Sequence, residues 1–218
     1  MTPCTLRREG AGHDSAPEGD TASASFLREL LRQGRGEAAC AYMPTPAADV
    51  LRRELAAGRI ADGTLCERAI LARLRAMTEA DWRPYDPGNE GLYHRLYQAA
   101  RSACTVDGLL SAAKTKRYPL ARLRRMVLAA YLQLPPAPAQ VPYIRVLAAT
   151  AAGRAHLRRL RDAGAPVLTK PADVSSLGSD AAALFALEGR CTDLYVLARP
   201  DLTQSAPGQD YRTTPVMI

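Results

Sequence analysis

The chain has 218 residues, of which 29 are Lys or Arg and 22 are Asp or Glu, giving a net charge of +7. This length suits one domain or slightly more, and a 47% share of hydrophobic residues excludes a wholly disordered chain. No apolar run approaches the roughly 20 residues of a membrane-spanning helix, and the N-terminus lacks the apolar segment of a secretory signal. We therefore expect no membrane association.

Cysteine and histidine usage argues against a metal centre. The five cysteines, at positions 4, 40, 66, 104 and 191, are widely separated and never form a C-x-x-C pair. Only three histidines are available as nitrogen ligands, so we expect no zinc site. An odd number of separated cysteines without a secretory signal is typical of reduced thiols, and it predicts a cytoplasmic protein.

The first predicted elements in chain order are a short strand and two helices. Residues 4–8 are expected to form a strand, which a polar loop follows. Ser23 or Ser25 can cap a helix that Gly34 ends, because serine oxygens accept from free helical N–H groups and glycine tolerates the conformation after a helix. A second helix is predicted at about 47–57.

Three further helices are predicted in the middle of the chain. Residues 64–67 have the spacing of a capping box ahead of an apolar run, and residues 90–104 carry an apolar stripe. Pro119 suits the start of a longer helix whose apolar residues recur every 3.6 positions up to Leu134. At 100° per residue, Arg122 and Arg125 are expected to point away from that stripe, toward solvent or a ligand.

The texture of the sequence changes after a proline-rich linker. Strands are expected at 143–150 and 165–170, a basic helix at 151–163 and a long helix at 179–198. Together with the earlier helices, this pattern predicts an α+β fold that is predominantly helical and has a few short strands.

Positive charge is concentrated in two blocks. The segment 114–125 contains six cations and no acid, and four arginines lie between Arg154 and Arg161. Two such blocks favour a polyanionic partner that is bound through phosphate contacts and counterion release. A solvated helix face explains the same charge pattern equally well, so charge alone leaves both interpretations open.

Several sequence blocks follow one another in a characteristic order: SASFLRELL, KTKRYPLARLRR, PYIRVLA, VLTKPAD and DYRTTPVMI. This succession resembles the C-terminal half of the bacterial tRNA(Met) cytidine acetate ligase family, a branch of the HIGH-type nucleotidyltransferases. The resemblance extends from about Leu6 to Ile218. It implies an enzyme that activates acetate with ATP as acetyl-adenylate. The acetyl group then passes to the exocyclic amine of the wobble cytidine in elongator tRNA(Met).

The sequence departs from the family in one respect, because it contains no H-x-G-H motif. The resemblance therefore implies a chain that lacks most of the N-terminal Rossmann-like domain, with that half as a possible missing partner. The regions expected on this basis are a remnant edge of that domain (1–22), a helical tRNA-binding region (23–134), a linker (135–142) and a small α/β region (143–218).

The resemblance also implies an ATP-binding set. LRREGAGHD matches a family segment of the form K-R-x-G-A-x-Y-H-D and places Arg8 at its ATP-contacting arginine. SASFLR matches S-A-T-x-x-R and adds Ser23, Ser25 and Arg28, with Mg²⁺ as the counter-ion of ATP. The alternatives are a surface arginine at position 8 and plain helix capping by the serines.

The KTKRY block and the helix after it are the expected tRNA-binding surface. A folded RNA is bound by dispersed cations, whereas Tyr118 is more typical of core packing than of base stacking.

No catalytic residue can be assigned. A non-catalytic RNA-binding module derived from the same family is the alternative, and a DNA-binding regulator is disfavoured because no helix-turn-helix is evident. The implied tRNA contacts are Lys114, Lys116, Arg117, Arg122 and Arg125.

Overall fold

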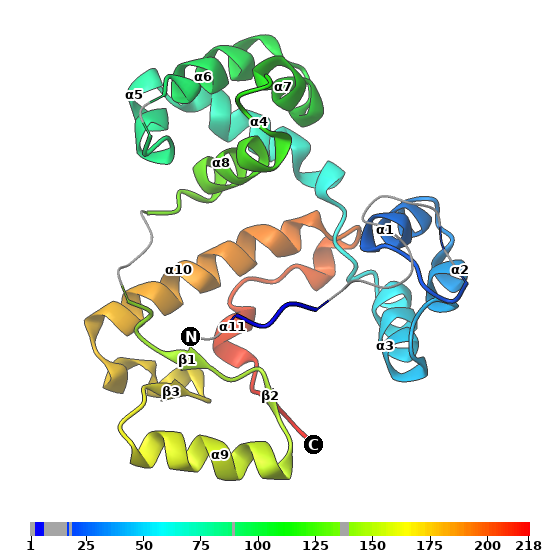
Figure 1. The fold of residues 1–218 in the computed structure, drawn as a ribbon, viewed down its shortest axis with the longest axis vertical. Helices are drawn as coiled ribbons and strands as arrows, with labels where there is room; N and C mark the ends of the chain where they lie inside the picture. The colour runs from blue at the N-terminus through cyan, green and yellow to red at the C-terminus, as the bar shows by residue number, and fades with distance from the viewer. Residues whose placement is uncertain (1–2, 7–16, 18, 89, 136–139) are drawn as a thin grey trace. The chain divides into compact units, whose positions relative to one another are not determined.

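The computed structural model describes residues 3–6, 17, 19–88, 90–135 and 140–218 (Figure 1). The described residues are mostly helical with a few two-residue strands, which confirms the predicted fold class. They divide into two units, one formed by residues up to Asp62 with Arg199–Gln204 and the other by Gly63–Ala198 with Ser205–Ile218. This division falls inside the segment 23–134 that sequence analysis treats as one helical region.

The first unit is a small group of helices. Its elements are α1 (Ala24–Arg32), α2 (Gly36–Cys40), α3 (Thr45–Ala56) and the 3₁₀ turn η5 (Leu202–Gln204). Ser23 begins α1, because its Oγ accepts from the Phe26 N–H at 3.2 Å. Gly34 ends the helix with φ +71°, a backbone conformation that glycine adopts without strain. Both helices predicted in this region are confirmed.

The predicted strand at 4–8 is not observed where the structure describes it. Residues 3–6 have no regular structure, and residues 7 and 8 lie outside the described part of the chain. Leu6 is 88% exposed. A strand needs a hydrogen-bonded neighbour, and the bridges that the structure shows elsewhere give residues 3–6 none.

The second unit begins with a helical bundle. Its elements are η1 (Gly63–Cys66), α4 (Glu67–Ala76), α5 (Glu79–Trp82), η2 (Arg83–Tyr85), α6 (Leu92–Ser102), α7 (Val106–Ala113) and α8 (Leu120–Leu132). Fully buried side chains from these helices form one core, among them Trp82, Leu96, Leu109 and Leu123. The apolar stripe predicted for α8 is confirmed at Leu123, Val127 and Ala130.

The capping box predicted at residues 64–67 is wrong. Cys66 is the N-cap of α4 and makes no side-chain cap bond. The Glu67 carboxylate instead accepts from the Val106 N–H at 2.9 Å, at the first residue of α7. A capping box does form at the next helix, α5. There the Thr78 Oγ1 accepts from the Asp81 N–H, and the Asp81 carboxylate accepts from the Thr78 N–H at 2.8 Å. Glu67 thus connects two helices that local spacing could not relate.

The rest of the second unit combines short strands with helices. Its elements are β1 (Ile144–Arg145), β2 (Ala148–Ala149), α9 (Ala151–Asp162), β3 (Val167–Leu168), η3 (Pro171–Leu177), α10 (Ser179–Tyr195), η4 (Val196–Ala198), α11 (Gln209–Arg212) and β4 (Val216–Met217). β1 pairs in parallel with β3, and β2 pairs in parallel with β4. The predicted strand at 143–150 is therefore two strands, because its ends have different partners.

Arg145 anchors the end of the chain in this region. Its guanidinium bonds Glu188 of α10 at 2.9 Å and Asp210 of α11, and it lies 5.1 Å from the centre of the Phe185 ring. The Tyr143 hydroxyl donates to the same Glu188 carboxylate at 2.7 Å. Burial, followed by this bond to Glu188, raises the pKa of Tyr143. The DYRTTPVMI block is thereby fixed to β1 and α10.

Candidate nucleic-acid interface

The KTKRY block is the connection between α7 and α8. Lys114 is the C-cap of α7 and Pro119 is the N-cap of α8. Pro119 fixes its φ at −67°, which suits the entry to a helix. Lys114, Lys116 and Arg117 are exposed, whereas the next residue is buried. A short connection with one buried residue therefore displays three cations at the surface of the bundle.

Tyr118 holds this connection in place. It is 6% exposed and belongs to the bundle core, and its hydroxyl donates to the Glu90 carbonyl at 2.8 Å. Its backbone N–H donates to Thr115 Oγ1 at 3.2 Å. The guanidinium groups of Arg117 and Arg122 each lie 5.6 Å from the centre of its ring. The packing role expected for Tyr118 is confirmed.

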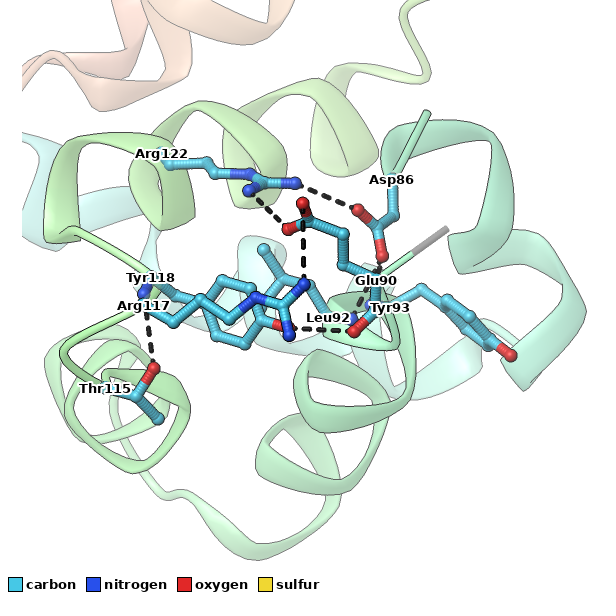
Figure 2. A network of polar contacts seen from close by, with 8 residues as sticks. All are labelled: Asp86, Glu90, Leu92, Tyr93, Thr115, Arg117, Tyr118 and Arg122. Carbon is cyan, nitrogen blue, oxygen red and sulfur yellow. Dashed lines mark hydrogen bonds and ion pairs between the residues drawn. The ribbon is translucent and has the colours of Figure 1, made fainter. Parts of the chain in front are cut away.

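A buried carboxylate lies behind this surface (Figure 2). The Asp86 side chain has no exposed area, and its Oδ2 accepts from the N–H groups of Leu92 and Tyr93 at 3.0 and 3.3 Å. These are the first N–H groups of α6, where the helix dipole favours a negative charge. Gly91, with φ +79°, allows the chain to turn between Asp86 and the helix.

Arg122 neutralises this carboxylate and a second one (Figure 2). Its Nη2 donates to Asp86 Oδ1 at 3.1 Å and its Nη1 donates to Glu90 Oε2 at 2.9 Å. Arg117 approaches the other oxygen of Glu90, with Nη2 at 3.6 Å from Oε1. The hydrogen bond from Arg122, followed by its charge, lowers the pKa of Glu90. The charges of the two carboxylates are thus neutralised by the two guanidinium groups.

Arg122 is less available than its position on the helix suggests. The 3.6-residue spacing directs Arg122 toward solvent, but its side chain is 30% exposed and is bound to Asp86 and Glu90. Both carboxylates lie more than 30 residues earlier in the sequence, so helical periodicity could not reveal them. The structure explains Arg122 as a scaffold residue without any ligand.

The five predicted tRNA contacts therefore differ in availability. Arg122 and Arg117 are paired with carboxylates, Arg117 through one longer contact and with a side chain that remains 65% exposed. Lys114, Lys116 and Arg125 are exposed and form no ion pair within the described residues. These three cations can reach an RNA phosphate without giving up an internal partner.

The predicted ATP contacts lie in the first unit, apart from Arg8, which is outside the described residues. Ser23 is 1% exposed and its Oγ already accepts from Phe26, so it serves as the cap of α1. Ser25 is half-buried and Arg28 is exposed, so these two can meet an anion. Arg28 is therefore more accessible to a triphosphate than Ser23 is. The ATP-binding set as a whole stays a prediction.

The described residues contain neither a metal-binding cluster nor a membrane-spanning helix. No three His, Cys, Asp or Glu side chains in the described ranges come together in a group that could hold a metal ion. Among these same residues, no helix has the length and apolar character needed to cross a bilayer.

Family membership follows from comparison with known proteins. Residues 1–210 match the HIGH Nucleotidyl Transferase family, to which the chain therefore belongs. The chain is also 26% identical over 99% of its length to the tRNA(Met) cytidine acetate ligase of Syntrophomonas wolfei, and 27% identical over 98% to that of Listeria monocytogenes. It covers 55% and 53% of those proteins, so it spans about half the length of the curated relatives it matches.

Solved structures show the same fold. The crystal structure of Thermotoga maritima TmcAL, in its apo form, matches 98% of this chain with a TM-score of 0.89 and 22% identity. A second structure of that protein, bound with alpha-thio ATP, matches 90% of the chain with a TM-score of 0.81. The chain covers 55% and 52% of those two chains.

Proposed function

We propose that this chain is the C-terminal portion of an ATP-dependent ligase that forms N4-acetylcytidine at the wobble position of elongator tRNA(Met). Its family membership and its similarity along nearly the whole chain to proteins named tRNA(Met) cytidine acetate ligase support this proposal. In the proposed reaction, acetate attacks the α-phosphorus of ATP and pyrophosphate leaves. The cytidine amine then attacks the acetyl carbonyl carbon, AMP leaves, and the amine loses a proton.

The observation that carries the proposal is the exposed cation set on the bundle. Lys114 and Lys116 lie on the connection between α7 and α8, Arg125 lies on α8 itself, and the contacts of Tyr118 and the Asp86–Arg122 pair hold the connection against the bundle. A preformed cation array loses little conformational entropy when it binds phosphates. We therefore assign tRNA docking to this bundle, with Arg117 able to exchange its long contact with Glu90 for a phosphate.

The proposed ligase needs ATP and acts on a cytoplasmic tRNA. ATP, with Mg²⁺ as its counter-ion, is the second substrate, and the structure of a relative bound with alpha-thio ATP supports the use of ATP. The sequence has no H-x-G-H motif, so we propose that an N-terminal nucleotidyltransferase half supplies the activating residues. The reduced cysteines and the tRNA substrate suit the cytoplasm.

The alternative is a non-catalytic RNA-binding module derived from the same family. One assay separates the two functions. The full chain is incubated with ATP, acetate and elongator tRNA(Met), alone and together with the N-terminal half of a ligase relative, and N4-acetylcytidine is measured by nucleoside mass spectrometry. Acetylation in either mixture supports the ligase. Binding of tRNA without acetylation in both mixtures supports the module, and absence of both activities contradicts both proposals.

A further inference from the structure

The second basic block of the sequence forms α9, and its cations are unusually free. Arg154, Arg158, Arg159 and Arg161 are all exposed, and Asp162, at the end of the helix, is the only acidic residue that α9 contains. Among the ion pairs of the described residues, none involves these arginines. This arrangement is the opposite of that at Arg122.

The helix directs its two leucines toward the strands and three arginines along one side. Leu157 and Leu160 are half-buried, and α9 packs against β2 and β3. Arg154, Arg158 and Arg161 follow one another at spacings of four and three residues, which places them in one row. The row continues beyond the helix, because Arg161 donates to Thr169 Oγ1 at 2.6 Å and the next residue, Lys170, is exposed.

Helix energetics explain only part of this row. Arg159 and Arg161 are in the last turn, where the helix dipole favours a cation. Arg154 is the fourth residue of the helix, near the end where the dipole disfavours a cation. Arg154 and Arg158 are also like charges one turn apart, which destabilises a helix. Asp162 lies one turn after Arg158 and offsets part of its charge, but Arg154 has no acidic residue one turn away in α9, and neither arginine is in an ion pair of the described structure. An external anion is therefore the natural partner.

The anion is more consistent with RNA phosphate than with a lipid surface. A membrane-bound basic helix needs a free apolar face. The two leucines of α9 are half-buried and the helix contacts β2 and β3, so its large apolar side chains are not free to enter a bilayer. A row of arginines with open guanidinium groups suits phosphate oxygens, which accept their paired N–H donors.

We propose that Arg154 and Arg158, continued by Arg161 and Lys170, form a second phosphate-binding surface for RNA, distinct from the one at residues 114–125. The proposal rests on the proposed function in so far as tRNA is the RNA that is bound. It assigns the row to sequence-independent contacts with the phosphate backbone, which add affinity and salt dependence and do not select the wobble base.

The test compares two double variants with the same change in charge. R154Q/R158Q removes the proposed contacts. The control R35Q/R68Q removes two exposed arginines outside both basic blocks, the N-cap residue of α2 and the second residue of α4. Affinity for elongator tRNA(Met) is measured from 50 to 300 mM salt. We expect R154Q/R158Q to weaken binding on the order of tenfold at 0.1 M salt and to reduce the log–log salt slope by about 1.5, because each lost phosphate contact removes about 0.7 to 0.9.

Each outcome of this test has a distinct meaning. R35Q/R68Q should bind like the unaltered chain, and R154K/R158K, which keeps the charge, should retain most of the affinity. Equal affinity and slope for the two glutamine variants would overturn the assignment of α9. The assignment would also be overturned if R154Q/R158Q lost binding to vesicles of anionic lipid but still bound RNA like the unaltered chain. If the folded, unaltered chain binds no tRNA at all, the proposed function fails together with this proposal.

Discussion

Replacement of Arg122 by methionine is expected to lower the free energy of unfolding by about 3 kcal/mol, because it leaves the fully buried Asp86 carboxylate without its cation. Glu90 loses its 2.9 Å hydrogen bond in the same variant. Methionine keeps much of the packing volume, so the loss reports mainly on charge. Urea unfolding of the full chain at neutral pH measures it.

A matched control and a rescue sharpen this prediction. Arg125 is exposed on the same helix, so R125M should change the stability by no more than about 0.5 kcal/mol. The D86N/R122M double variant should recover part of the loss, because no buried charge then remains without a partner. If R122M were no less stable than R125M, Arg122 would not be the scaffold residue described here.

Replacement of Arg145 by methionine is expected to lower the free energy of unfolding by about 2 kcal/mol, since Glu188 and Asp210 both lose their cation in a partly buried site. The effect is expected to be smaller than at Arg122 because the Glu188 side chain is 36% exposed and retains the Tyr143 hydroxyl as a donor. Chemical unfolding measures this loss as well.

The position of the end of the chain provides a second readout for Arg145. Loss of the Asp210 contact should increase amide hydrogen exchange in residues 209–217, which the Arg145 guanidinium connects to β1 and α10. R158M, which removes an exposed arginine of α9, is the control and should change neither quantity. Unchanged exchange in R145M would contradict the anchoring role.

Periodic apolar patterns predicted the long helices well. The helices α1, α3, α6, α8, α9 and α10 lie where spacing and capping placed them, within a few residues. The short helix α7 escaped prediction. It has eight residues and includes Gly108, so its periodic signal is weak. The strands β1 and β2 were expected as one strand because local sequence does not contain the identity of the partner strand.

The ion pairs between residues far apart in the sequence were the part of the site that could not be predicted from the sequence. The KTKRY cations were correctly placed before a helix, and Tyr118 was correctly expected in the core. Arg122 could not be separated from Arg125 by periodicity, since its carboxylate partners come from the segment before α6. In the sequence, the only indication of such a pair was the presence of two acidic residues, Asp86 and Glu90, just before the start of α6.

The two basic blocks therefore differ in how their arginines are paired with carboxylates. In the block at 114–125, paired arginines stiffen a connection that displays free cations. In α9, the exposed arginines have no acidic partner within the described residues. A preformed surface and a more open row of guanidinium groups together suit a large, folded polyanion better than a small one.

Binding of the purified chain to elongator tRNA(Met) and to an unrelated tRNA, at two salt concentrations and with or without ATP, tests the central claim most directly. We expect selective binding of tRNA(Met) that weakens steeply as salt increases, because several phosphate contacts release counterions. Equal and weak binding of the two RNAs would contradict the claim, since it would reduce the exposed cations to a nonspecific basic surface.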